Sequence, residues 1–150
     1  MIRRKISKKI LEKEESQLWN AFIDILAMEN EQKLNDIQKI AQRVFWYDSE
    51  VQNGGHIQYF ENINLKDYAP IIDSLKLIGA NNHAAILEKA AKIFFKDGRK
   101  KLTTVDELID ESLKEENLKL DSEYAGIKPD INYYLKEYLN KNINEFIEME

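Results

Sequence analysis

Residues 46–62, with the sequence WYDSEVQNGGHIQYFEN, interrupt a helical pattern in the middle of this 150-residue chain. Apolar residues spaced three and four apart lead into the stretch, stop at Gly54 and Gly55, and resume beyond them with aromatic residues. Glycine readily adopts the left-handed conformation that ends a helix, so one of the two glycines is expected to end a helix that begins near residue 31. A short helix over residues 56–61 is expected to follow.

The same spacing of apolar residues continues on both sides of the glycines, and no stretch shows the alternation typical of a strand. The sequence therefore predicts an all-α fold, a single-domain bundle of about six to eight helices over residues 1–150, with residues 1–6 able to fray. Four of the predicted helices cover residues 7–28, 31–51, 56–61 and 118–124. Two more are bounded by caps and glycines: one begins at Asp67, has Pro70 in its first turn and ends at Gly79, and the next is capped by Asn81 or Asn82 and ends at Gly98. A further helix begins with a capping box of Thr104 and Glu107, and the last begins at Pro129 and runs to Ile147.

The net charge of −5 is spread unevenly along the chain. Residues 1–15 carry six basic and three acidic side chains, whereas residues 104–150 carry five basic and thirteen acidic ones. Acids three or four residues apart on a helix lie about 5–6 Å apart, close to the spacing of charges along DNA. The sequence predicts an acidic partner surface formed by Asp106, Glu107, Asp110, Glu111, Glu115, Glu116, Asp121 and Glu123. The plainer alternative is a solvated helix face that keeps the protein soluble.

Several kinds of chemistry are disfavoured by what the chain lacks. Without cysteine it has no disulfide, thiolate metal site or cysteine nucleophile, which fits a reducing cytoplasm. Its two histidines do not have metal-binding spacing, and Ser49 lacks the G-x-S-x-G context of a nucleophile. No apolar run approaches the roughly 18 residues of a membrane helix, and the basic start is not followed by an apolar signal segment. We therefore expect a cytoplasmic protein with no cofactor, no metal site, no membrane contact and no catalytic residue.

Polar side chains gather around the two glycines and suggest a binding site. The candidate pocket residues are Glu50, Asn53, Gly54, Gly55, His56, Gln58, Tyr59 and Asn62. The free N–H groups of a helix that starts here could bind an anion, although Glu50 would oppose one. Alternatively, the glycines allow two helices to pack closely, the aromatic residues fill the junction, and the amides cap helix ends. The residues alone leave both interpretations open.

The glycine motif also resembles a known family. Residues 50–62, EVQNGGHIQYFEN, resemble the E-V-x-N-G-G-x-x-Q-[FY]-[FY]-x-N signature of the bacterial DNA-mimic-protein-like domain family, a domain of unknown function. Supporting likenesses run over about residues 15–147 and include the I-G-A-x-x-x-A segment at residues 78–84, Arg99, and an L-D-x-x-[FY] element at residues 120–124. The resemblance implies an all-helical cytoplasmic protein without known catalytic activity. It also implies DNA mimicry, in which an acidic protein binds a transcription factor.

These observations favour a non-enzymatic bacterial protein-binding domain that acts as an acidic DNA mimic and sequesters a DNA-binding protein. The expected partner is a basic protein, either a DNA-binding regulator or a toxin, and direct binding to nucleic acid is not expected. Two alternatives stay open: a small-ligand or enzymatic pocket at Asn53-Gly54-Gly55, and an immunity-type inhibitor of a toxin. A homodimer is compatible with the sequence.

Overall fold

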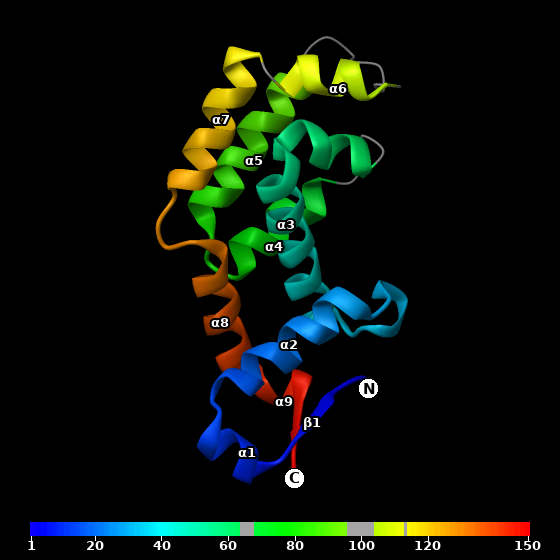
Figure 1. Cartoon of the computed structure of the whole chain (residues 1–150), viewed down its shortest axis with the longest axis vertical. Coiled ribbons are helices and arrows are strands. Elements are labelled where there is room, and N and C mark those ends of the chain that lie inside the picture. Colours follow the sequence, from blue (N-terminus) through cyan, green and yellow to red (C-terminus); the bar gives the residue numbers. More distant parts are fainter. Residues whose placement is uncertain (64–67, 96–103, 113) are drawn as a thin grey trace.

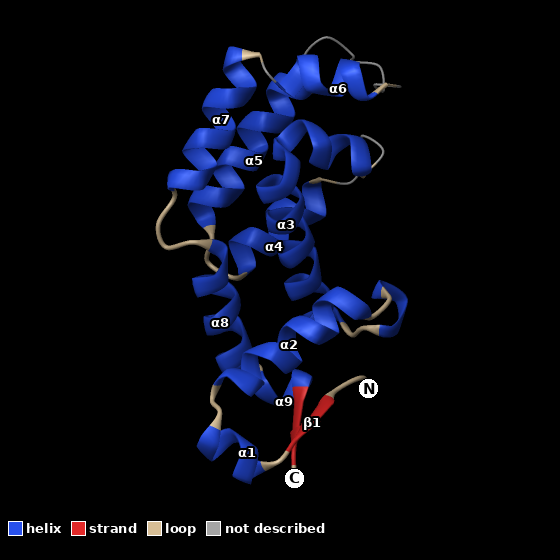
Figure 2. Ribbon diagram, viewed as in Figure 1, coloured by secondary structure: helices blue, strands red, loops and turns tan. Residues whose placement is uncertain are grey.

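The structure, a computed structural model of the chain, describes residues 1–63, 68–95, 104–112 and 114–150 (Figure 1). Helices make up nearly all of it, which confirms the all-α prediction (Figure 2). They are α1 (Lys8–Lys13), α2 (Ser16–Met28), the 3₁₀ helix η1 (Glu31–Lys33), α3 (Asp36–Asn62), α4 (Ala69–Leu77), α5 (Asn81–Phe94), α6 (Val105–Ser112), α7 (Glu115–Gly126), α8 (Ile131–Lys141) and α9 (Ile143–Phe146). In the described residues the strands are β1 (Arg4–Ile6) and β2 (Ile147–Met149), which pair in parallel with Arg4 opposite Ile147.

Helix α3 is the centre of the fold and contacts helices on every side of it, including α2, α4, α6, α7 and α8 (Figure 1). It begins with a capping box, because the Gln38 N–H donates to Asn35 Oδ1 and the Asn35 N–H donates to Gln38 Oε1. The predicted break at the glycines is confirmed: Gly55, with φ 78° and ψ 179°, is not helical and divides α3 into two helical halves at a kink. The predicted helix over 56–61 is the second half of α3.

Two predicted long helices are wrong because the chain breaks within them. The helix predicted over 7–28 is interrupted between α1 and α2. Residues 12–17 include no apolar side chain, so a helical turn there could not be stabilised by packing against the core. The final helix, predicted to run to Ile147, ends at Lys141 because Asn142 leaves helical geometry, and α9 and β2 follow. Residues 1–6, which the sequence predicts to be able to fray, include strand β1 (Arg4–Ile6).

The predicted helix ends had mixed outcomes. Pro70 lies in the first turn of α4 and Gly79 follows its end with φ 91°, as predicted. The predicted cap by Asn81 or Asn82 is wrong, because α5 begins after Ala80 without a side-chain cap. Thr104 Oγ1 accepts a hydrogen bond from the Glu107 N–H at 3.1 Å, which is one half of the predicted capping box. The expected roles of Asp67 and Gly98 lie outside the described residues.

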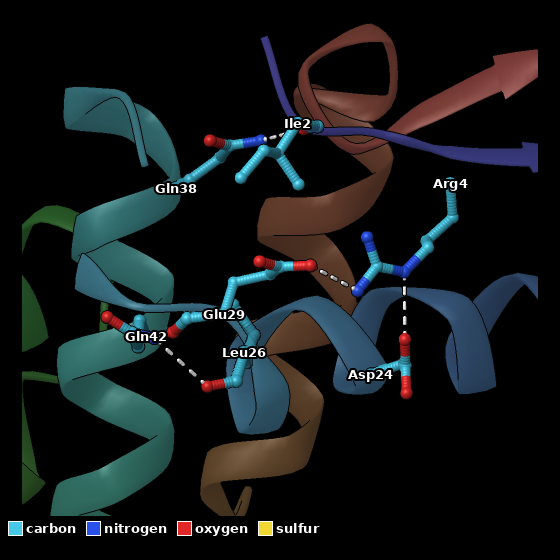
Figure 3. Close-up of polar contacts among 7 residues, drawn as sticks. All are labelled: Ile2, Arg4, Asp24, Leu26, Glu29, Gln38 and Gln42. Atoms are coloured by element: carbon cyan, nitrogen blue, oxygen red, sulfur yellow. Dashed lines mark hydrogen bonds and ion pairs between the residues drawn. The ribbon is translucent and has the colours of Figure 1, made fainter. Parts of the chain in front are cut away.

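A buried glutamine joins the two ends of the chain to α3. Gln38 is fully buried, and its Nε2 donates to the carbonyl oxygen of Ile2 at 2.6 Å (Figure 3). The same Nε2 donates to the carbonyl oxygen of Glu145 at 2.7 Å. These bonds satisfy backbone groups on both terminal segments with one side chain, while the same residue caps α3. The N-terminal and C-terminal segments are therefore both fixed to the start of the central helix.

Two further contacts hold α2 in place beside this junction (Figure 3). Gln42 Nε2 donates to the Leu26 carbonyl at 3.2 Å and to the Glu29 carbonyl at 2.7 Å, at the end of α2. On the other side, the Arg4 guanidinium binds Asp24 and Glu29, each at 2.8 Å. Strand β1 and helix α3 thus both bind the C-terminal half of α2.

Replacing Gln38 by alanine tests this junction. We expect Gln38→Ala to lower the free energy of unfolding by about 1–3 kcal/mol, because two partly buried carbonyls lose their donor and α3 loses part of its cap. Urea denaturation followed by circular dichroism measures the change. Gln32→Ala is the matched control, since Gln32 is exposed and is expected to stay within about 0.5 kcal/mol of the wild type. Equal effects of the two substitutions would contradict the assigned role of Gln38.

Candidate functional site

The bend at Gly55 requires glycine for two separate reasons. Its φ of 78° and ψ of 179° lie where residues with a Cβ are strained. A Cβ built there would also lie 2.3 Å from Oδ2 of Asp121, a residue of α7. The carboxylate of Asp121 therefore occupies the space that any other residue would need. At Gly54 a Cβ would meet the side chain of Gln58 instead, with Oε1 at 2.0 Å.

His56, directly after the bend, contacts Asp121 of α7 and Tyr47 in the first half of α3. Its N–H donates to Asp121 Oδ1 at 3.1 Å, its Nδ1 lies 2.8 Å from the same oxygen, and its Nε2 lies 2.7 Å from Tyr47 Oη. Burial raises the pKa of the Tyr47 hydroxyl well above its usual range, so the phenol keeps its proton. In the neutral imidazole, Nδ1–H donates to the carboxylate, which can only accept, and Nε2 then accepts from the Tyr47 hydroxyl.

A second pair of side chains joins α7 to the first half of α3, before the bend. Tyr124 Oη donates to Asp48 Oδ1 at 2.6 Å, and burial raises the pKa of both groups. The Tyr124 ring meets the rings of Tyr47 and His56 edge to face, at centroid distances of 5.6 Å and 5.5 Å. Tyr47 and Tyr124 are not among the candidate site residues from the sequence. The signal that could have indicated one of them is the L-D-x-x-[FY] element, whose three-residue spacing places Asp121 and Tyr124 on one face of α7.

The remaining motif residues divide into groups that the structure separates. Gln58 Nε2 and Asn62 Nδ2 both donate to Glu50 Oε2. The Glu50 carboxylate, which precedes the bend, is thus bonded to two residues that follow it in α3. Asn53 is exposed, whereas His56 is buried and bound to Asp121. Tyr59 is buried, and its hydroxyl has no hydrogen-bond partner among the described residues. A ligand pocket at this motif stays a prediction from the sequence.

The second histidine lies behind the same aromatic cluster. His83 of α5 is buried, and its ring meets the edges of Tyr124 and Tyr134 at centroid distances of 5.2 Å and 6.0 Å. Its Nδ1 has no hydrogen-bond partner among the described residues. Burial lowers the pKa of His83, and the nearby carboxylate of Asp130 opposes that shift only in part. His83 is therefore held neutral inside the fold.

The predicted acidic surface lies at the far end of the molecule from both chain termini, where α6 and α7 meet (Figure 1). Five of its residues are exposed: Asp106, Glu107, Asp110, Glu115 and Glu116. The other three are engaged with neighbours: Asp121 with His56, Glu111 with Lys114 at 2.8 Å, and Glu123 with Lys89 at 3.9 Å. The structure thus gathers the exposed acids on α6 and the first turn of α7.

At the opposite end, acidic and basic side chains face each other. Parallel pairing of β1 with β2 brings Arg3 to 3.8 Å from Glu148 and Lys5 to 3.8 Å from Glu150. Arg4 binds two carboxylates of α2. Such partly exposed pairs add little stability, but they neutralise this end locally. At the α6 end, by contrast, residues 105–117 carry six acidic side chains and one basic side chain, Lys114.

Within the described ranges, no cluster of three or more histidine, aspartate or glutamate side chains is arranged to hold a metal ion. No helix in that part of the chain combines the length and the apolar character needed to cross a bilayer.

Comparison with known proteins gives one family. A family model described as DMP19-like protein matches residues 32–142, which includes the glycine motif and all of α6 and α7. No curated protein and no solved structure matches the chain.

Substitution of Gly55 tests the close approach of Asp121. We expect Gly55→Ala to lower the free energy of unfolding by about 2–3 kcal/mol, because the methyl group forces a strained backbone and displaces the carboxylate. Chemical denaturation measures the change. Gly126→Ala is the matched control: a Cβ there meets nothing within 4 Å and φ is not positive, so this variant should be neutral or slightly more stable. Similar losses in both variants would refute the explanation.

The buried His83 predicts a dependence of stability on pH. Because its pKa is lower in the folded chain than the usual 6.5, the unfolded chain takes up a proton that the folded chain resists. The contribution of His83 is complete above about pH 6.5 and is lost as the pH falls toward the folded pKa. We expect wild type to lose more unfolding free energy between pH 7 and pH 5 than His83→Leu, measured by urea denaturation at each pH. Parallel pH profiles of the two proteins would contradict this.

Proposed function

The chain belongs to the family of DMP19-like proteins, and from that membership we propose that it is a non-enzymatic binding protein whose acidic end occupies the DNA-binding surface of a basic partner. The observation that carries the proposal is the gathering of exposed acids on α6 and the first turn of α7, away from the neutralised terminal end. Binding there would sequester the partner from DNA.

The spacing of the acids supports recognition by a surface that normally contacts phosphates. Asp106 and Asp110 are one helical turn apart and both exposed, which puts their carboxylates on one side of α6 about 5–6 Å apart. They take part in no ion pair within the described residues. Complementary charge speeds encounter with a basic protein and repels nucleic acid.

Two lysines limit how much DNA this surface can imitate. Lys114 and Lys119 stand beside Glu115 and Glu116 around an open hollow of about 460 Å³ on α7. The acidic surface is therefore short and mixed rather than a continuous row. It suits a partner with a compact basic patch, and a basic toxin would be recognised by the same charges as a DNA-binding regulator.

Neutralising the acids of α6 tests the proposal. The tagged protein is purified from its native cell, the captured partner is identified, and the complex is eluted with rising salt. We expect elution at moderate salt, because exposed charges are screened over about 8–10 Å. The double variant Asp106→Asn/Asp110→Asn should capture the partner at least about tenfold less well, a loss of ~1.4 kcal/mol.

The control carries the same change of charge elsewhere. Glu12→Gln/Glu137→Gln alters two exposed acids of α1 and α8, away from the acidic end, and should capture the partner as wild type does. The isolated complex should also compete with a DNA duplex for the partner. A partner that is retained in molar salt, or that binds DNA and this protein together, would disprove the proposal.

A further inference from the structure

Helix α6 exposes apolar side chains beside its acids. Val105 is 71% exposed and Ile109 is 49% exposed, and the two are one helical turn apart. Asp106 directly follows Val105 in the sequence, and Asp110 directly follows Ile109. An apolar row and an acidic row therefore run side by side along the helix. We call these four residues the α6 stripe.

Within the described residues, the α6 stripe takes part neither in the hydrophobic core nor in an ion pair. Helix α6 contacts α3 and α7, and the residues that turn inward are Leu108, which packs against the core, and Glu111, which is buried. A row of solvated residues would serve the fold as well as valine and isoleucine do. Single exposed apolar residues are ordinary. Two in register, beside acids that have no ion-pair partner in the part of the chain that the structure describes, form the apolar centre and charged edge of a small interface.

Imitation of DNA does not require the apolar row either. A protein surface that contacts phosphates supplies positive charge and hydrogen-bond donors, which would meet Asp106 and Asp110 but leave Val105 and Ile109 against water. An amphipathic helix with lysine or arginine beside an apolar row matches both rows at once, since helices pack by fitting such rows together.

We propose that the α6 stripe docks a basic amphipathic helix of the partner, with the basic residues of that helix on Asp106 and Asp110 and its apolar residues over Val105 and Ile109. This inference rests on the proposed function, because it names the part of the basic partner that is bound. It assigns affinity to the acids and selectivity among basic partners to the apolar row.

Two synthetic peptides separate the roles of charge and apolar contact. Both are helices of about 18 residues with lysines on one side; the first has leucines at helical spacing beside them, and the second has alanine at every leucine position. Fluorescence titration with the full-length protein should give at least about tenfold tighter binding of the leucine peptide, or ~1.4 kcal/mol. Val105→Ser/Ile109→Ser should abolish that difference.

A matched variant controls for general stickiness of exposed apolar residues. Leu77 at the end of α4 is 67% exposed and lies outside the α6 stripe, so Leu77→Ser should keep the tenfold difference. Circular dichroism should show that all variants are folded, since the replaced side chains are exposed.

Each outcome decides a different claim. If both peptides bind equally, the acidic surface stands and the docking proposal is overturned. If neither binds, recognition of basic partners by this end fails as well, and the proposed function falls with it.

A second copy of the chain is a competing occupant. Helix α1 carries Lys9 and Lys13 beside Ile10, which is 49% exposed, and lies at the opposite end of the molecule from α6 (Figure 1). If sedimentation shows that wild type self-associates and that Val105→Ser/Ile109→Ser abolishes it, the stripe is covered by another copy and docking of a foreign helix is overturned.

Discussion

The contact between the Asp121 carboxylate and the bend at Gly55 is the constraint on which the rest of the arrangement depends. One oxygen of Asp121 receives two donors of His56, and the other lies where a Cβ of residue 55 would be. This fixes α7 against the two halves of α3. Because Asn117 Nδ2 of α7 donates to the Glu111 carbonyl at 2.8 Å, the end of α6 is fixed in turn. The position of the acidic end thus follows from a glycine fifty residues earlier in the chain.

What could be predicted from the sequence was local in origin. The break at the glycines, Pro70 in a first turn and Gly79 after a helix end are set by backbone preferences that neighbouring residues reveal. The pairing of His56 with Asp121 spans 65 positions, and no periodicity in one sequence identifies it. Asp121 was therefore assigned to the acidic surface with its neighbours, whereas the structure also gives it a role in packing.

Counting charges along the chain likewise does not show which of them are paired after folding. The excess of acids in residues 104–150 includes Glu148 and Glu150, which β1 and β2 pairing brings to Arg3 and Lys5 from the other end of the chain. Pairing across 145 positions cannot be read from local composition. Within the described residues, the exposed acids of the predicted surface gather on α6 and the start of α7, and the size of any partner surface that they can match is limited accordingly.

The glycine motif and the α6 end differ in whether their polar groups are already bonded within the protein. At the glycine motif, Glu50 already accepts from Gln58 and Asn62, and both ring nitrogens of His56 are occupied. A ligand there would have to replace these bonds, and each buried polar group left unpaired costs about 1–3 kcal/mol. The exposed carboxylates of Asp106 and Asp110 carry no such cost, because a partner would replace water rather than protein. Recognition by the α6 end therefore needs no rearrangement of the fold, whereas binding at the motif would have to disturb the contact that positions α7.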